Sequence, residues 1–351
     1  MCRSALHDLL VALPKCEHHM HLEGSLEPDL LFELAEKKKI QLPTDDDAFG
    51  SVETLLARYR RFTSLDDFLH YYFIGMTVLL DAGDFEALAY AYFTKAHSQR
   101  VIHAEVFFDP QAHTSRGVDY STVVDGFVRA QERARRDYGM SSELIVCLLR
   151  HFTPGDCYTA YQEFVPDLKS GRVAGLGLSS TEKDHPPSLY RQPFGEARRD
   201  GFKLTAHAGE EADVSYMRGA VEDLSCTRVD HGIRLRDDME LMKRFARERI
   251  LITMCPLSNL ELNCVRSVSE LPIREYIDNK VPFSLNSDDP AYFDSYIQEN
   301  YCAVQDAFHL TRDEWEQLVT NSITLSWCSD ERKQEMLRDL ARTLREQSGQ
   351  S

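Results

Sequence analysis

The sequence predicts an α/β protein that folds as a (β/α)8 barrel of the TIM type, with extra helices over the barrel mouth between strands 1 and 2. Eight short apolar runs alternate with segments of helical periodicity, as expected for buried parallel strands joined by helices. An open doubly wound sheet is the alternative, but it should show a glycine-rich turn after its first strand. The first run ends instead in His19-Met20-His21, which favours the barrel.

The expected elements follow in chain order and form one domain over residues 1–351. The strands are expected at Lys15–His21, Val101–Phe108, Glu143–Leu149, Arg172–Leu178, Lys203–His207, Arg228–His231, Ile250–Cys255 and Val281–Leu285. Helical spacing of apolar residues is found at Asp29–Lys39, Ser51–Phe62, Asp66–Leu80, Asp84–Gln99, Ser121–Tyr138 and Asp237–Arg247. Residues 22–100 are too many for a single crossover, so we expect a helical insertion there.

Composition excludes several classes of partner. The formal net charge of -17 does not suit a protein that binds nucleic acid or an anionic membrane. The nine cysteines are scattered without a CxxC pair, which favours a reducing compartment. There is no leader-like segment and no apolar run long enough to span a bilayer. We expect a cytoplasmic protein, with the nucleus as an additional location; the sequence does not predict the oligomeric state.

Two histidines end the first expected strand. His19 and His21 are two positions apart, so on a strand their side chains point to the same side and could bind one metal ion. The alternative is a pair of hydrogen-bonded polar residues at a strand end. An isolated HxH pair does not decide between these interpretations.

Further ionisable residues follow the fifth and eighth expected strands. His207 would supply a third nitrogen, and Glu210 would lie beside the metal because Gly209 permits a tight turn. After the eighth strand, one carboxylate of Asp288 and Asp289 could bind the metal and the other the substrate. The alternatives are a solvated acidic pair after the fifth strand and an Asx turn or helix cap before Pro290.

Three nitrogens and a carboxylate fit a catalytic zinc ion, although iron and manganese accept similar ligands. Such a metal lowers the pKa of a bound water to about 7. His231 ends the sixth expected strand, where a neutral imidazole could orient the hydroxide. In a barrel all these strand ends meet at one face, so the residues are expected to converge.

The motifs resemble those of the adenosine/adenine deaminase family of amidohydrolase barrels, and the match covers most of the chain. The motifs are His19-Met20-His21-Leu22-Glu23-Gly24-Ser25, Thr205-Ala206-His207-Ala208-Gly209-Glu210, Asp230-His231-Gly232, Cys255-Pro256-Leu257-Ser258-Asn259 and Ser284-Leu285-Asn286-Ser287-Asp288-Asp289-Pro290.

The resemblance implies an enzyme that hydrolyses a purine 6-amino group, with one zinc ion per chain. The implied zinc ligands are His19, His21, His207 and Asp288. Glu210 would protonate the purine N1, His231 would assist the hydroxide, and Asp289 would bind N7. Adenine would become hypoxanthine and ammonia, a reaction of purine salvage.

Glu23 and the run Ala291-Tyr292-Phe293 resemble the adenine type of the family more than the adenosine type. The resemblance implies that Glu23 helps to fill the space that a ribose would occupy. Ser179 stands where the adenine type usually has Asp, so the carboxylate that the resemblance implies at the N3 and N9 edge of the purine is missing at this position. Ser180 is a candidate donor at that edge.

Four alternatives remain open. The first is a deaminase of adenosine or of N6-substituted adenine. A phosphorylated purine would require Arg or Lys near the mouth, where Arg116 and Lys183 are candidates. Two-metal amidohydrolases commonly bridge their two ions with a modified Lys on the fourth strand. No Lys lies in the fourth expected strand here, so a two-metal site is disfavoured. A purine-binding protein without catalysis shares the fold and would be distinguished by assaying metal and turnover together.

Overall fold

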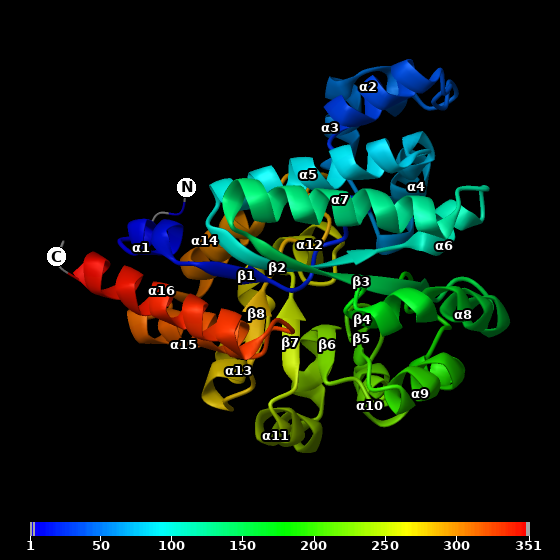
Figure 1. The fold of residues 1–351 in the computed structure, drawn as a ribbon. Coiled ribbons are helices and arrows are strands. Elements are labelled where there is room, and N and C mark those ends of the chain that lie inside the picture. Colours follow the sequence, from blue (N-terminus) through cyan, green and yellow to red (C-terminus); the bar gives the residue numbers. More distant parts are fainter. Residues whose placement is uncertain (1, 3, 349–351) are drawn as a thin grey trace.

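The computed structural model describes residues 2 and 4–348, and its centre is a barrel of parallel strands (Figure 1). Eight strands lie side by side in chain order, each parallel to the next. They are β1 (Lys15–Glu17), β2 (Val101–Phe108), β3 (Ser141–Leu149), β4 (Gly175–Ser179), β5 (Lys203–Ala208), β6 (Arg228–His231), β7 (Leu251–Met254) and β8 (Phe283–Leu285).

The first and last strands approach each other at the end where the chain leaves them. The Asp288 amide donates to the His19 carbonyl at 3.0 Å, and the His21 amide donates to the Asp288 carbonyl at 2.9 Å. Met20 and Asp288 form an isolated parallel bridge, as do His21 and Phe107. The histidine pair therefore lies between the ends of β2 and β8.

Helices connect the strands and cover the outside of the barrel. They are α1 (His7–Ala12), α2 (Pro28–Lys38), α3 (Val52–Tyr59), α4 (Leu65–Gly75), α5 (Ala82–Ser98), α6 (Pro110–Thr114), α7 (Tyr120–Tyr138), α8 (Pro154–Ser170), α9 (Arg191–Arg199), α10 (Val214–Glu222), α11 (Met239–Glu248), α12 (Pro256–Glu261), α13 (Ile273–Asp278), α14 (Ile297–Phe308), α15 (Arg312–Thr324) and α16 (Asp330–Ser348). No helix in the described part of the chain is long and apolar enough to cross a membrane.

Four helices, α2 to α5, lie between β1 and β2, which confirms the expected barrel with a helical segment at this place. These helices occupy different positions on the barrel. α5 packs side by side with α7 along the barrel, as Figure 1 shows. α4 contributes Leu65, Phe68 and Tyr72 to the wall of a cavity at the barrel mouth. Ser64 begins α4 by accepting a hydrogen bond from the Asp67 amide at 3.2 Å, a typical N-cap.

Strand positions were predicted well and strand ends less well. β6 has the expected bounds, whereas β1 ends at Glu17 rather than at His21. The His18 amide donates to the side-chain oxygen of Asn286 at 2.8 Å, so regular backbone pairing stops there. Beyond this point His19 and His21 are held by the loop that follows β8.

Candidate active site

The four residues expected to bind metal meet where β1, β5 and β8 end. His19 Nε2 lies 3.1 Å from Asp288 Oδ1, and His21 Nε2 lies 3.7 Å from the same oxygen. His21 Nε2 is also 3.1 Å from His207 Nε2. Ligand atoms about 2.0–2.1 Å from one tetrahedral ion stand roughly 3.3–3.4 Å apart, so these separations fit a single cation.

One of these nitrogens is buried without a hydrogen bond. His19 Nε2 has no hydrogen-bond partner, although Asp288 Oδ1 is 3.1 Å away. Two ligands of one metal ion lie this close together because both point at the ion, and no hydrogen bond between them is needed. Burial opposes a charge on His21, but Asp109 and Asp289 raise its pKa to about 10, so the surrounding acids favour a positive charge here.

The other ring nitrogens face groups that orient the imidazoles. His19 Nδ1 lies 3.0 Å from Thr253 Oγ1, and His207 Nδ1 lies 3.4 Å from Asp230 Oδ2. Thr253 in turn donates to Asp230 Oδ1 at 2.8 Å. Burial and, to a smaller extent, the nearby His19 lower the pKa of His207 to about 4. The Nε2 lone pair of His207 is therefore free to bind a metal. Such partners fix the orientation of metal-binding histidines.

His231 lies on the other side of Asp288. Ligand atoms of His19, His207, His231 and Asp288 all lie within 4.8 Å of one another, so this set includes His231 and leaves out His21, one of the expected ligands. The Asn259 amide donates to His231 Nδ1 at 3.2 Å, which leaves the ring proton on Nε2. A protonated Nε2 donates rather than binds a metal, and this favours His21 as the third histidine ligand.

Glu210 is placed beside His231 by the turn after β5. Its Oε2 lies 3.4 Å from His231 Nε2, and its Oε1 accepts from the Asn259 amide at 3.3 Å. Gly209 has a φ of +74°, and a Cβ there would come within 2.7 Å of Met217, so glycine is required. Burial, together with the charge of Asp288, raises the pKa of Glu210 well above its usual value, which favours a carboxylic acid at neutral pH.

Asp289 is a second carboxylate that favours its protonated form. Burial and the neighbouring Asp288 raise its pKa well above the usual value. In contrast, His19 and His231 hold the pKa of Asp288 well below its usual value, although burial opposes this. Gly24 packs against Asp289 so closely that a Cβ would lie 2.0 Å from Asp289 Oδ1. Of these two neighbouring side chains, Asp288 therefore favours the ionised form and Asp289 the neutral, protonated form.

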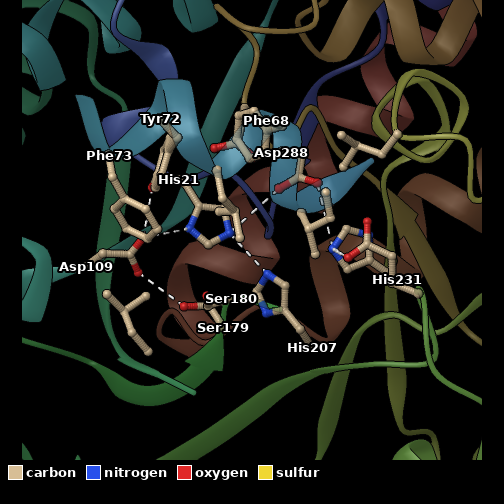
Figure 2. A pocket seen from close by; sticks show the side chains of 16 residues that line it. His21, Phe68, Tyr72, Phe73, Asp109, Ser179, Ser180, His207, His231 and Asp288 are labelled. Atoms are coloured by element: carbon tan, nitrogen blue, oxygen red, sulfur yellow. Dashed lines mark hydrogen bonds and ion pairs between the residues drawn. The ribbon is translucent and has the colours of Figure 1, made fainter. Parts of the chain in front are cut away.

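These groups line a cavity of about 420 Å³, including its mouth (Figure 2). Its apolar wall comes mainly from α4, and its polar floor from the strand ends. The lining residues are His21, Leu65, Phe68, Leu69, Tyr72, Phe73, Asp109, Leu149, Ser179, Ser180, His207, Glu210, His231, Leu262, Asp288 and Asp289. An apolar wall with a few converging polar groups is typical of a site for a small molecule.

Asp109 lines the cavity and was missed from the sequence. It follows β2 directly, and Figure 2 shows its carboxylate between Tyr72, His21 and Ser179. Oδ2 accepts from the Tyr72 hydroxyl at 2.8 Å, and Oδ1 accepts from Ser179 Oγ at 3.2 Å. Burial opposes ionisation, but His21 and Tyr72 lower the pKa of Asp109, so it carries a charge. An ionisable residue directly after a predicted strand was the signal that could have found it.

The two other residues expected to contact substrate lie differently. Ser180 lines the cavity, and its Oγ is 2.8 Å from His151 Nδ1. Glu23 is buried behind the lining. Its Oε1 accepts from His113 Nε2 at 2.9 Å and from the Asp109 amide at 3.0 Å. This arrangement supports a role for Glu23 in positioning Asp109 rather than in touching the substrate.

A family model described as adenosine deaminase matches residues 14–343. The chain belongs to the adenosine deaminase family. An adenine deaminase from Schizosaccharomyces pombe is 53% identical over 348 residues, covering 99% of this chain and 95% of that protein. One from Saccharomyces cerevisiae is 49% identical over 334 residues, covering 94% and 95%.

Solved structures of the family share the fold over nearly the whole chain. The crystal structure of an adenine deaminase from Arthrobacter aurescens superposes with a TM-score of 0.89 at 36% identity, covering 95% of this chain and 100% of that one. An amidohydrolase from Burkholderia ambifaria with bound Zn has a TM-score of 0.86 at 26% identity, covering 99% and 98%. The expected family is thereby confirmed, and the buried cluster has the side chains and the spacing of a metal site.

Proposed function

We propose that this chain is a zinc-dependent adenine deaminase that converts adenine and water to hypoxanthine and ammonia. The observation that carries the proposal is a buried histidine–aspartate cluster with the carboxyl group of Glu210 on one side and that of Asp109 on the other. The named relatives are adenine deaminases and align over nearly the full chain, which supports the same reaction here.

One zinc ion at this centre would be held by His19, His21, His207 and Asp288. When bound, zinc lowers the pKa of a water ligand to about 7 and so supplies a nucleophile at neutral pH. Asp288 Oδ2 accepts a hydrogen bond from Ser258 Oγ at 2.7 Å, which leaves Oδ1 facing His19 and His21.

Glu210 transfers the protons. As an acid it gives its proton to N1, which makes C6 electrophilic while the water oxygen bonds to C6. One proton of the water then replaces the proton on Glu210, and the other leaves with the 6-amino group as ammonia. The C6–N bond breaks and the C6 carbonyl forms. His231, protonated on Nε2 and 3.4 Å from Glu210 Oε2, orients the incoming oxygen by donating a hydrogen bond.

Adenine presents three ring acceptors and one ring donor, and the cavity matches this pattern. N1, N3 and N7 accept, whereas N9 carries the proton. Protonated Glu210 and Asp289 are donors for N1 and N7. Ionised Asp109 is an acceptor for N9–H, beside Ser179 and Ser180, which we place at the N3 edge. A nucleoside has no proton on N9, so this pairing favours the free base over adenosine.

Phosphorylated purines are disfavoured by the same cavity. Among the described residues that line it, none is Lys or Arg. Arg116 donates to the Met76 carbonyl at 2.9 Å and is not part of the lining, and Lys183 is exposed. Since a buried phosphate needs cationic partners, neither residue supports a nucleotide substrate in this position.

Cysteine chemistry supports a cytoplasmic location. All nine cysteines are free thiols, and no pair is joined in a disulfide. Such a set is typical of proteins in a reducing compartment. A salvage enzyme for a free purine base would find its substrate there.

A substrate panel tests the proposed function. Zinc-loaded protein is assayed by ultraviolet absorbance with adenine, adenosine, N6-methyladenine and AMP. We expect the highest kcat/KM for adenine and no turnover of AMP. Preference for N6-methyladenine or adenosine would replace adenine as substrate within the same chemistry. A protein that binds adenine and zinc but turns over none of the four would be a binding protein.

A further inference from the structure

A second cluster of metal-ligand side chains joins the N-terminal segment to α14. Cys2 Sγ lies 3.1 Å from His7 Nδ1, and Cys302 Sγ lies 3.9 Å from the same nitrogen. The three ligand atoms all lie within 4.8 Å of one another. None of these residues lines the active-site cavity.

We propose that Cys2, His7 and Cys302 bind a zinc ion at a second site that ties the start of the chain to α14. A tetrahedral zinc ion with bonds of about 2.3 Å to sulfur and 2.0–2.1 Å to nitrogen sets its ligands roughly 3.5–3.8 Å apart. The two measured separations bracket that range. Two thiolates and an imidazole are soft enough to select zinc over magnesium, calcium or manganese.

The surroundings of Cys302 also suit a metal-bound thiolate. Gln298, one helical turn earlier on α14, donates its amide N–H to Cys302 Sγ at 3.5 Å. The proposed site takes water as its fourth ligand. Hydrogen bonds to ligating groups of this kind strengthen metal sites.

The cluster is partly exposed, so an ion can reach it from solvent. Cys2 is 8% exposed, whereas His7 and Cys302 are half-buried. Ser4, between the two N-terminal ligands, accepts a hydrogen bond from Gln305 of α14 at 3.0 Å. The segment is thus already held against this helix without the ion, and zinc would add a cross-link between distant parts of the sequence.

Cobalt spectroscopy separates this site from the catalytic one. A thiolate bound to Co²⁺ gives a near-ultraviolet charge-transfer band, whereas the histidine–aspartate cluster contains no sulfur. Full-length protein with its purification tag at the C-terminus is depleted of metal, titrated with Co²⁺, and compared with Cys2→Ser and Cys302→Ser. Cys328→Ser is the matched control, because Cys328 is also a half-buried free thiol. Zinc content and adenine turnover are measured on the same samples.

We expect the band in wild type and in Cys328→Ser, and its loss in both cluster variants. Zinc content should fall by about one ion per chain in those variants, while adenine turnover stays unchanged. If either variant fails to fold, His7→Ala and the titration of wild type still decide the matter. A wild type without the band, or a Cys2–Cys302 disulfide detected by mass in freshly purified protein, would overturn the proposal.

Discussion

Replacing Asp109 with asparagine tests whether the negative charge of Asp109 makes the enzyme prefer adenine, which carries a proton on N9. Asparagine keeps the size of the side chain but has one acceptor oxygen and no charge. Asp109 is only 2% exposed, and its oxygens accept from Tyr72 and Ser179. Either hydroxyl can rotate to accept from the new amide, so the variant should fold.

The expected loss follows from the hydrogen bond that is weakened. A hydrogen bond to a charged group contributes about 1.5–3 kcal/mol. Since each 1.36 kcal/mol is tenfold in rate, kcat/KM for adenine should fall roughly 10- to 150-fold. The same change should matter much less for 9-methyladenine, which has no proton on N9 to donate.

The assay is a two-by-two comparison. Asp109→Asn and wild type are each measured with adenine and 9-methyladenine, using the inhibition constant where turnover of the methylated base is too slow. Ser179→Ala is the control, because it removes a donor to Asp109 and a partner at the N3 edge, which both bases share, and leaves the charge. An equal loss for both substrates would refute the assignment and make Asp109 a structural residue.

Two further predictions concern the metal and the acid. Glu210→Gln should keep its zinc and lose about 10²- to 10⁴-fold in kcat, the range for a general acid, because glutamine cannot transfer a proton. The check is to measure kcat and zinc content on one sample. An unchanged kcat would remove Glu210 from the role of general acid. His21→Ala and Asp288→Ala should each lose zinc affinity, while His231→Ala should keep zinc and lose turnover. Retained zinc in His21→Ala together with lost zinc in His231→Ala would exchange the two histidines in the ligand set.

The barrel and the metal cluster could be predicted because both depend on local pattern. Apolar runs alternating with helical segments specify parallel strands, and strand ends meet at one face whatever their distance in sequence. His19, His207 and Asp288 were found for that reason, and their ligand atoms do lie within 4.8 Å of one another. The ends of several strands differed by one to four residues, and β1 stops at Glu17 because the His18 amide bonds to the Asn286 side chain.

The substrate side of the cavity could not be predicted in the same way. The charge of Asp109 depends on His21 and Tyr72, and Tyr72 comes from a helix whose packing over the mouth no local pattern specifies. Glu23 follows the histidine motif, yet it does not line the cavity. The sequence places a residue near a site, but the partners that decide its role come from other elements.

Glu23→Asp separates the interpretation drawn from the sequence from the one drawn from the structure. If Glu23 filled the ribose space, the shorter side chain should admit adenosine. In the structure its Oε1 instead bonds His113 and the Asp109 amide, at 2.9 Å and 3.0 Å. A side chain one methylene shorter cannot reach both groups, so Asp109 should lose its position. We therefore expect kcat/KM for adenine to fall by about tenfold or more, on the scale of one charged hydrogen bond, without a gain for adenosine. Glu23→Gln is the matched control, because its amide oxygen can still accept from both groups. A gain in the absolute kcat/KM for adenosine in Glu23→Asp, absent from Glu23→Gln, would return Glu23 to the substrate.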